Sequence, residues 1–271
     1  MQEYPHFNMV GEEWSGNALV VAHWLRGAHN RDGYVSSMPS MMDFPLHYVL
    51  RRALTEKDSL HSGLTDLYEA LVNDNLYPVP SDMVLFEGNH DVPRIFSVLG
   101  EDLGLWKMAM AYVLTMPRTP QVYYGTEVLM TSPTERDDGA TRKDFPGGWA
   151  GDKVNAFTGA GLTPEQREAQ SFLRTLMQWR KTKAVIHHGR LMHFWPQEGT
   201  YAWVRYDDRD AVLVVINKNH EPRTLPVARF REAIGDRRHG RDVITGREVD
   251  LSTSVTVPAR SVVVLDLDPA K

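Results

Sequence analysis

A short apolar run that stops abruptly at polar residues constrains this chain more than any other stretch. Residues 83–86, Met-Val-Leu-Phe, are continuously apolar, which is the pattern of a strand covered on both faces. The sequence Glu-Gly-Asn-His-Asp follows at once at residues 87–91. Because α/β enzymes keep their chemistry at the carboxyl ends of parallel strands, we expect functional side chains here. A turn of the same composition could also serve only to cap the next helix.

A second apolar run ends in the same way. Residues 7–10 are followed by Gly11 and Glu12, so a second predicted strand also ends in a small residue and a carboxylate. Glycoside hydrolysis requires such a pair, because one carboxyl group protonates the leaving oxygen while another carboxylate faces the developing oxocarbenium charge. The two strand ends together therefore favour sugar chemistry over simple capping.

Five motifs resemble those of the α-amylase family of glycoside hydrolases, family thirteen, and its neopullulanase and cyclomaltodextrinase-like branch. They agree with the family in order and spacing over nearly the whole chain. In chain order they are Gly11-Glu12 with Trp14 following, Met42-Asp43-Phe44-Pro45-Leu46, Phe86-x-x-Asn89-His90-Asp91, Tyr123-Tyr124-Gly125-Thr126-Glu127, and Asp144-Phe145-Pro146-Gly147-Gly148-Trp149.

The resemblance implies roles for two carboxyl groups. Glu12 corresponds to the family's general acid/base, a carboxyl group kept protonated near neutrality by an apolar setting, for which Trp14 would form a wall. Glu13 is the competing residue and is more simply read as a surface carboxylate. Asp91 corresponds to the carboxylate that stabilises the transition state and binds sugar hydroxyls without becoming covalently bound.

Four residues are predicted to bind substrate. His90 corresponds to the histidine that hydrogen-bonds the sugar at the cleavage site, and Asn89 and Trp14 belong to the same motifs. Arg94 could hold one of the carboxylates, with an ordinary surface salt bridge as the alternative.

The resemblance implies an α/β fold in two parts. Residues 1–185 would form the second half of a (β/α)₈ TIM barrel, strands five to eight, and residues 186–271 an all-β C-terminal sandwich. In the family the nucleophilic Asp follows the fourth strand, and no segment here matches its Gly-x-Arg-x-Asp pattern. A complete barrel takes about 250 residues. We therefore expect this chain to be the C-terminal part of a longer enzyme and to be inactive alone.

Local patterns predict the elements of both parts. Strands are expected at 41–44 and 120–125, and helices after Pro45, over 103–116 and over 164–183, the last with a capping box at Thr163. From His188 the apolar period becomes two or gives way to short apolar blocks. Further strands are expected at 201–206, 211–216, 252–257 and 261–267, with turns at 207–208 and 245–246.

A loop at 131–161, which has six glycines and no periodicity, is expected to border the substrate cleft. Its acidic residues could collect calcium, although their spacing fits no known loop, and a solvated acidic loop is the better reading. Phe145 and Trp149 would either stack on glucose units or pin the loop. Asp43 and Glu127, at predicted strand ends, would either support the site or cap helices. The sequence predicts no metal site or cofactor in this chain and leaves calcium open for the parent protein.

Composition restricts the classes of partner that this chain is expected to bind. The net charge of −5 and the absence of a Lys/Arg stripe argue against nucleic acid, and no run of 18 apolar residues could span a membrane. Zero cysteines exclude disulfides and fit either the cytoplasm or secretion, with a bacterial periplasmic or secreted location slightly favoured. The expected partners are α-glucan oligosaccharides, the missing N-terminal half of the barrel, and a second copy of the chain.

The resulting hypothesis is a retaining glycosidase that cleaves α-glucosidic bonds in starch-derived glucans. Pullulan, cyclodextrin and maltooligosaccharides remain open as substrates, as does the choice between hydrolysis and transglycosylation. The alternative is a non-catalytic glucan-binding or scaffold fragment.

Overall fold

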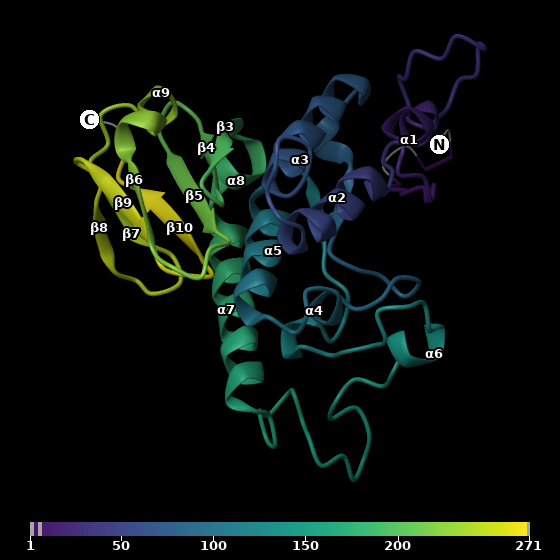
Figure 1. Cartoon of the computed structure of the whole chain (residues 1–271). Helices are drawn as coiled ribbons and strands as arrows, with labels where there is room; N and C mark the ends of the chain where they lie inside the picture. Colours follow the sequence, from purple (N-terminus) through teal and green to yellow (C-terminus); the bar gives the residue numbers. More distant parts are fainter. Residues whose placement is uncertain (1–2, 5–6, 270–271) are drawn as a thin grey trace.

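The computed structural model describes residues 3–4 and 7–269. A helical part with a small parallel sheet packs against an all-β part at the C-terminal end (Figure 1). The α-helices are α1 Ala18–His23, α2 Phe44–Thr55, α3 Leu64–Glu69, α4 Ile95–Val98, α5 Leu103–Thr115, α6 Asp138–Thr141, α7 Pro164–Thr182, α8 Ala184–His188 and α9 Arg231–Ile234. The 3₁₀ helices are η1 Ala70–Leu76, η2 Pro80–Asp82, η3 Thr126–Val128 and η4 Val227–Phe230. The strands are β1 Val84–Phe86, β2 Thr119–Gln121, β3 Arg190–Gln197, β4 Thr200–Tyr206, β5 Ala211–Asn217, β6 Arg223–Pro226, β7 His239–Asp242, β8 Glu248–Asp250, β9 Ser254–Val257 and β10 Ser261–Leu267.

Four short segments of the helical part run parallel to one another, in the order of the sequence. Gly11 bridges Met41, Met42 bridges Val84, and β1 pairs with β2. The strand predicted at 41–44 is shorter than expected, because the Asp43 side chain already caps α2 by accepting a hydrogen bond from the Leu46 backbone N–H at 3.1 Å. The strand predicted at 120–125 likewise pairs only over Thr119–Gln121.

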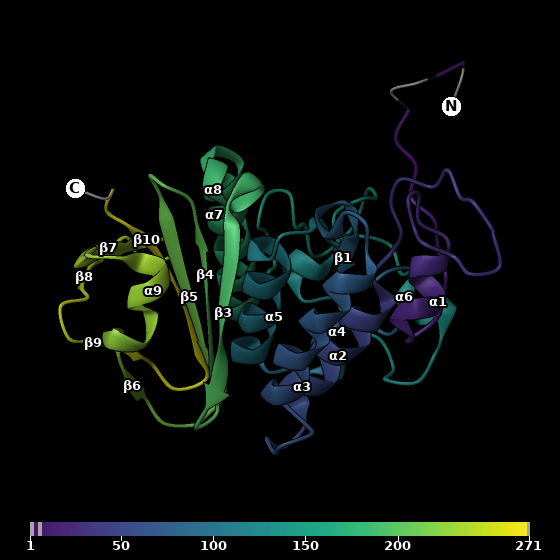
Figure 2. The same cartoon turned by 90° about the horizontal axis from the view of Figure 1, so that it is seen from above.

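The two long predicted helices are confirmed. Helix α5 is buried almost all round because it lies between the parallel strands and the C-terminal sheet (Figure 2). Helix α7 begins with the predicted capping box, in which Thr163 and Gln166 exchange side-chain and backbone hydrogen bonds. In the part of the chain that the structure describes, no helix is both long and apolar enough to cross a membrane.

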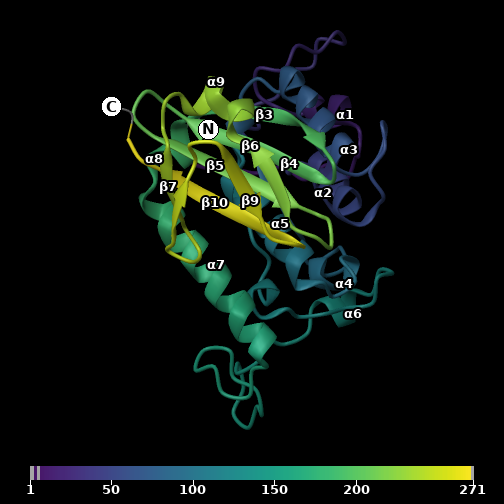
Figure 3. The ribbon, with the colours of Figure 1, turned by 60° about the vertical axis from the view of Figure 1, so that its left-hand side comes forward.

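The C-terminal part is an antiparallel sandwich, as predicted. Six strands form one sheet in the order β3-β4-β5-β10-β7-β8, and β6 pairs with β9 in a second, smaller sheet. Figure 3 shows the smaller sheet and α9 on the side of the large sheet that faces away from the helices. Strands β4 and β5 are buried on both faces for this reason. The predicted boundary between the two parts, at residue 185, lies inside α8.

Polar contacts join the two parts. The Trp203 indole N–H donates to Thr115 Oγ1 at 3.0 Å, and Arg205 donates to the Thr115 carbonyl oxygen at 2.9 Å. Lys218, which follows the last residue of β5, donates from Nζ to Asp58 Oδ1 at 2.6 Å. The large sheet therefore serves as a rigid backing for α5 and, through it, for the parallel strands.

A buried ion pair fixes the second of the four parallel segments. Arg118 Nε lies 3.2 Å from Asp43 Oδ2, both side chains are almost fully buried, and Arg118 also binds Asp74. We expect Asp43→Ala to lower the free energy of unfolding by about 2–4 kcal/mol, because it leaves the buried Arg118 guanidinium with Asp74 as its remaining carboxylate partner and removes a helix cap. Urea titration measures this change.

The control for that experiment is a surface pair of similar geometry. Arg190 and Asp208 lie 3.1 Å apart with side chains that are 63% and 97% exposed. We expect Asp208→Ala to change stability by less than about 0.5 kcal/mol. Equal effects of the two substitutions would show that the buried pair does not stabilise the fold.

Candidate active site

The carboxyl ends of the four parallel segments lie together on one side of the small parallel sheet, which is called the carboxyl edge below. Because the segments pair in parallel, Glu12, Asp43, Glu87 and the chain after β2 all follow strand residues at that edge. A Cβ on Gly11 would meet Met41 Sδ, so the Met41 side chain packs closely against the backbone that leads to Glu12. Asp91, four residues beyond Glu87, leaves the same edge.

A chain of contacts links Glu12 to Asp91. The Trp14 indole N–H donates to Glu12 Oε1 at 2.6 Å, and the Arg136 guanidinium lies over the Trp14 ring at 5.3 Å from its centroid. Arg136 Nη2 is in turn 3.5 Å from Asp91 Oδ1. Glu12 and Trp14 are both exposed, so this edge is open to a ligand. Two of the predicted catalytic carboxyl groups therefore face one solvent-accessible region.

Asp91 is contacted by an arginine and a histidine side chain. Arg142 Nη2 lies 2.6 Å from Asp91 Oδ1, and His90 Nε2 lies 3.3 Å from Asp91 Oδ2. Arg142 also donates to the His90 carbonyl oxygen at 2.9 Å, which fixes the backbone between the two residues. The Asp91 side chain is only 18% exposed, whereas that of His90 is 56% exposed. His90 is therefore the better placed of the two to meet a ligand first.

Asn89 lies beneath this surface. Its side chain is buried and accepts a hydrogen bond from the Asp91 backbone N–H at 2.9 Å. Its Nδ2 has no hydrogen-bond partner among the described residues. Asn89 thus shapes the turn that presents His90 and Asp91, and does not line the open surface.

The expectation that Arg94 would hold a carboxylate or touch substrate is wrong. Arg94 is 2% exposed. Its guanidinium donates to the carbonyl oxygens of Thr141 and Tyr124 and stacks on the rings of Tyr123 and Tyr124. Burial in this cage of carbonyls and rings gives Arg94 a structural role, and Arg136 and Arg142 take the predicted place beside Asp91.

Glu87 is a buried carboxyl group at this edge to which the sequence analysis gave no individual role. Its carboxyl group is fully buried, and desolvation raises its pKa to about 7 despite hydrogen bonds from the Thr126 hydroxyl and from the backbone N–H groups of Tyr123 and Gly88. These bonds tie the end of β1 to the turn after β2. The available signal was a carboxylate directly after a strand that is apolar on both faces.

Glu87 predicts a specific dependence of stability on pH. The folded pKa of about 7 exceeds the ordinary 4.5, so its stabilisation is complete below about pH 4.5 and is lost as pH rises through 7. The change amounts to about 3 kcal/mol. Burial lowers the pKa of His47 from 6.5 to about 3, which gives the opposite trend between those two pH values and so overlaps the Glu87 range. The difference between wild type and Glu87→Gln isolates the contribution of Glu87.

Urea unfolding at several pH values between 4.5 and 8 makes this comparison. We expect the stability of the wild type relative to Glu87→Gln to fall by about 3 kcal/mol over that range. Glu165→Gln, at an exposed position in the first turn of α7, should give a curve parallel to that of the wild type. A parallel curve for Glu87→Gln would instead show that Glu87 does not titrate in this range.

The predicted loop at 131–161 contacts the site through α6 and its flanks, which supply Arg136 and Arg142. Its acidic residues serve local structure: Asp137 caps α6, Asp138 pairs with Arg136, and Asp152 accepts backbone hydrogen bonds from residues 147 and 149. Within the described residues, no group of three His, Cys, Asp or Glu side chains could hold a metal ion.

The aromatic residues of this loop and the carboxylates at the strand ends divide between the two roles considered for them. Phe145 packs against the buried cluster of Val128, Ala156 and Leu162, so it pins the loop to η3, whereas Trp149 is 68% exposed. Asp43 caps a helix, and Glu127 lies half-buried in η3.

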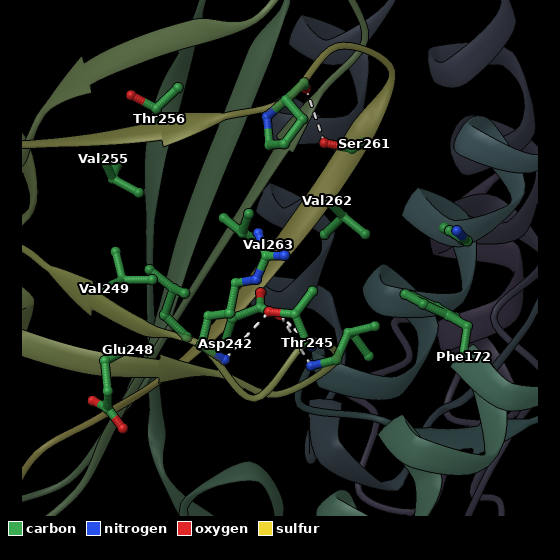
Figure 4. A pocket seen from close by; sticks show the side chains of 15 residues that line it. Phe172, Asp242, Thr245, Glu248, Val249, Val255, Thr256, Ser261, Val262 and Val263 are labelled. Carbon is green, nitrogen blue, oxygen red and sulfur yellow. Dashed lines mark hydrogen bonds between the residues drawn. The ribbon is translucent and has the colours of Figure 1, made fainter.

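A separate cavity lies between the large sheet and α7, with Phe172 on one wall and Asp242 and Val263 on the other (Figure 4). The Asp242 carboxylate accepts hydrogen bonds from Ile244 and Thr245, which close the turn after β7. The hydrogen-bonding capacity of the Asp242 carboxylate is therefore used for local structure.

Comparison with known proteins supports the sugar-processing reading. Residues 1–214 match the family model described as alpha amylase, catalytic domain, and residues 191–266 match the cyclo-malto-dextrinase C-terminal domain. Cyclomaltodextrin glucanotransferase from Paenibacillus macerans is 25% identical over 242 residues, which is 84% of this chain and 31% of the relative. Cyclomaltodextrinase from Geobacillus thermopakistaniensis (strain MAS1) is 24% identical over 227 residues, 82% of this chain and 34% of the relative.

The fold is also shared with a solved structure. The crystal structure of alpha-amylase from Geobacillus thermoleovorans, complexed with acarbose, matches with a TM-score of 0.76 at 19% identity. The match covers 98% of this chain and 54% of that one. The chain therefore spans about a third of the length of these curated relatives and about half of the solved structure.

Proposed function

This chain belongs to the alpha-amylase family of glycoside hydrolases, and we propose that it is the C-terminal part of an enzyme that cleaves α-glucosidic bonds in starch-derived glucans with retention. One observation carries the proposal: Glu12 and Asp91 leave the same edge of the parallel strands and are linked there through Trp14 and Arg136. Acid-catalysed departure of a sugar requires one carboxyl group that donates a proton and a second that stabilises the developing positive charge, both on one open face.

Glu12 acts as the general acid/base in this proposal. Its proton passes to the glycosidic oxygen as the bond to the leaving sugar breaks, and its carboxylate later deprotonates the incoming water or sugar hydroxyl. The hydrogen bond from Trp14 to Oε1 leaves Oε2 free to hold that proton. Asp91 faces the positive charge that develops on the donor sugar, and the exposed His90 binds a hydroxyl of that sugar.

A retaining mechanism also needs a nucleophilic carboxylate within about 5–5.5 Å of the acid. The other carboxyl groups at this edge serve structure, since Asp43 is buried against Arg118 and Glu87 is buried among backbone donors. We propose that the nucleophile comes from a segment outside this chain. The reaction then uses only protein carboxyl groups and needs no cofactor, and any calcium would belong to the longer enzyme.

The two lateral edges of the small parallel sheet are the proposed contact with the segment that carries the nucleophile. Within the described residues, the segment at Gly11 and strand β2 each pair on one side only. Phe7 and Val10, beside the first of these edges, are 61% and 52% exposed. Unpaired strand edges of this kind bind another strand, either from the rest of the barrel or from a second copy.

We place the enzyme in the bacterial periplasm or outside the cell, where large glucans are encountered.

The alternative is a glucan-binding or scaffold fragment without catalysis, which is supported by the structural use of Asp43 and Glu87. Assay of the longer protein on pullulan, cyclodextrin and maltooligosaccharides separates the two. Release of reducing sugar supports the enzyme, and binding without release supports the fragment.

A further inference from the structure

A pocket of about 510 Å³ lies where the end of α7 meets the large sheet. Trp179 and Lys183 line it from the side of α7, and Asp266 of β10 and Asp210, directly before β5, line it from the side of the sheet. Figure 3 shows this end of α7 next to β7 and β10. The pocket therefore lies at the junction between the helical part and the sandwich, and ligand sites are common at junctions of this kind.

The pocket is remote from the carboxyl edge. Arg180, in the last turn of α7, donates from Nε to the Leu114 carbonyl oxygen at 2.9 Å. Leu114 belongs to the last turn of α5, which leads into the first residue of β2. The end of α7 thus lies beside the amino ends of the parallel strands, on the side opposite to the proposed catalytic groups.

Hydrogen bonds and ion pairs order the walls of the pocket. The Trp179 indole N–H donates to Asp266 Oδ2 at 3.0 Å. Lys183 Nζ lies 2.7 Å from Asp266 Oδ1 and 3.6 Å from Asp210 Oδ1. Asp266 therefore fixes both an aromatic ring and an ammonium group. The side chains of Lys183, Asp266 and Asp210 remain 17%, 28% and 34% exposed, so a ligand can reach groups that are already held in place.

These groups have the chemistry of a sugar site. The apolar face of a pyranose ring packs on an indole, while its hydroxyl groups accept hydrogen bonds from an ammonium and donate to carboxylates. Among the charged side chains that line the pocket, five are carboxylates and two are cationic. This excess of negative charge favours a neutral sugar over a phosphorylated one.

We propose that this pocket is a second glucan-binding site, which takes one or two glucose units of a neutral α-glucan at a distance from the point of cleavage. Trp179 is the stacking residue, Lys183 and Asp210 bind hydroxyl groups, and Asp266 positions Trp179 and Lys183. The choice of a glucan over another neutral sugar rests on the proposed function. Such a site holds one stretch of a long glucan on the protein while another stretch reaches the carboxyl edge, so it favours polymers over short oligosaccharides.

Calorimetric titration of the 271-residue chain with maltose tests the inference. We expect Trp179→Ala and Asp210→Asn each to weaken maltose binding by about two- to tenfold, because the first removes a stacking ring and the second a charged hydrogen-bond acceptor. Asp208→Asn is the matched control. Asp208 is two residues from Asp210, its side chain is 97% exposed, and it does not line the pocket. This variant should bind maltose like the wild type.

A site-specific readout on the wild type covers the case in which Trp179→Ala does not fold. The indole N–H resonance of Trp179, identified by its loss in Trp179→Phe, should shift as maltose is added. Asp210→Asn should raise the maltose concentration that produces half of this shift by the same two- to tenfold. His90→Ala, at the carboxyl edge, should leave that concentration unaltered.

Three results would overturn the inference. They are a wild type that does not bind maltose, an indole resonance that stays fixed while maltose binds, and wild-type affinity in both Trp179→Ala and Asp210→Asn. None of them bears on the proposed function, which is decided separately by the release of reducing sugar from the longer protein.

Discussion

In the longer enzyme, Glu12→Gln is expected to lower kcat on maltooligosaccharides by about 10²–10⁴-fold, the usual contribution of a general acid. Glutamine keeps the shape of the side chain and an oxygen that accepts the Trp14 hydrogen bond, so KM should change little. It cannot deliver a proton to the glycosidic oxygen. The loss should therefore appear in the chemical step and not in binding.

A substrate with a better leaving group distinguishes this role from damage to the fold. An α-glucoside of an acidic phenol needs little protonation, so Glu12→Gln should retain much more of the wild-type rate of glycosidic cleavage on it than on maltooligosaccharides. Glu165→Gln, a change from carboxyl to amide at an exposed position on α7, should leave both rates unaltered. Equal losses on the two substrates would contradict the assignment of Glu12 as the acid.

The second large effect is the absence of turnover in the chain alone. Acid and stabiliser without a nucleophile provide no route through a glycosyl-enzyme intermediate, so we expect the 271-residue chain to release no reducing sugar above background. The open strand edges and the exposed Phe7 and Val10 should also drive self-association, measured as mass in solution. Robust turnover by a monomer would show that the nucleophile lies within these residues.

The sequence predicted helices and strands well where the local pattern of apolar and capping residues was strong. The apolar surface of α5, the capping box of α7 and the apolar strands β4, β5 and β10 depend on residues that are neighbours in sequence, and each was confirmed. Strands β3 and β6 to β8 were missed because they are only partly buried, so their apolar pattern is weak.

The site was predicted less completely because its details depend on contacts across long sequence distances. The burial of Arg94 is set by carbonyl oxygens at Tyr124 and Thr141, and the cations at Asp91 come from a loop that has no periodic signal. Glu87 is buried because the turn after β2 covers it, and no pattern around residue 87 indicates that cover. The motifs predicted which residues carry the chemistry, but not which ones face solvent.

The most direct test of the division of labour proposed here is to trap the covalent intermediate. A fluorinated α-glucosyl fluoride, whose fluorine slows hydrolysis of the glycosyl-enzyme, would be reacted with the longer enzyme, and the labelled peptide identified by mass spectrometry. We predict a glycosyl ester on an aspartate outside this chain, in a segment that contributes the missing barrel strand. A label on Asp43, Glu87 or Asp91 would contradict the proposal that this chain supplies the acid and the stabilising carboxylate but not the nucleophile.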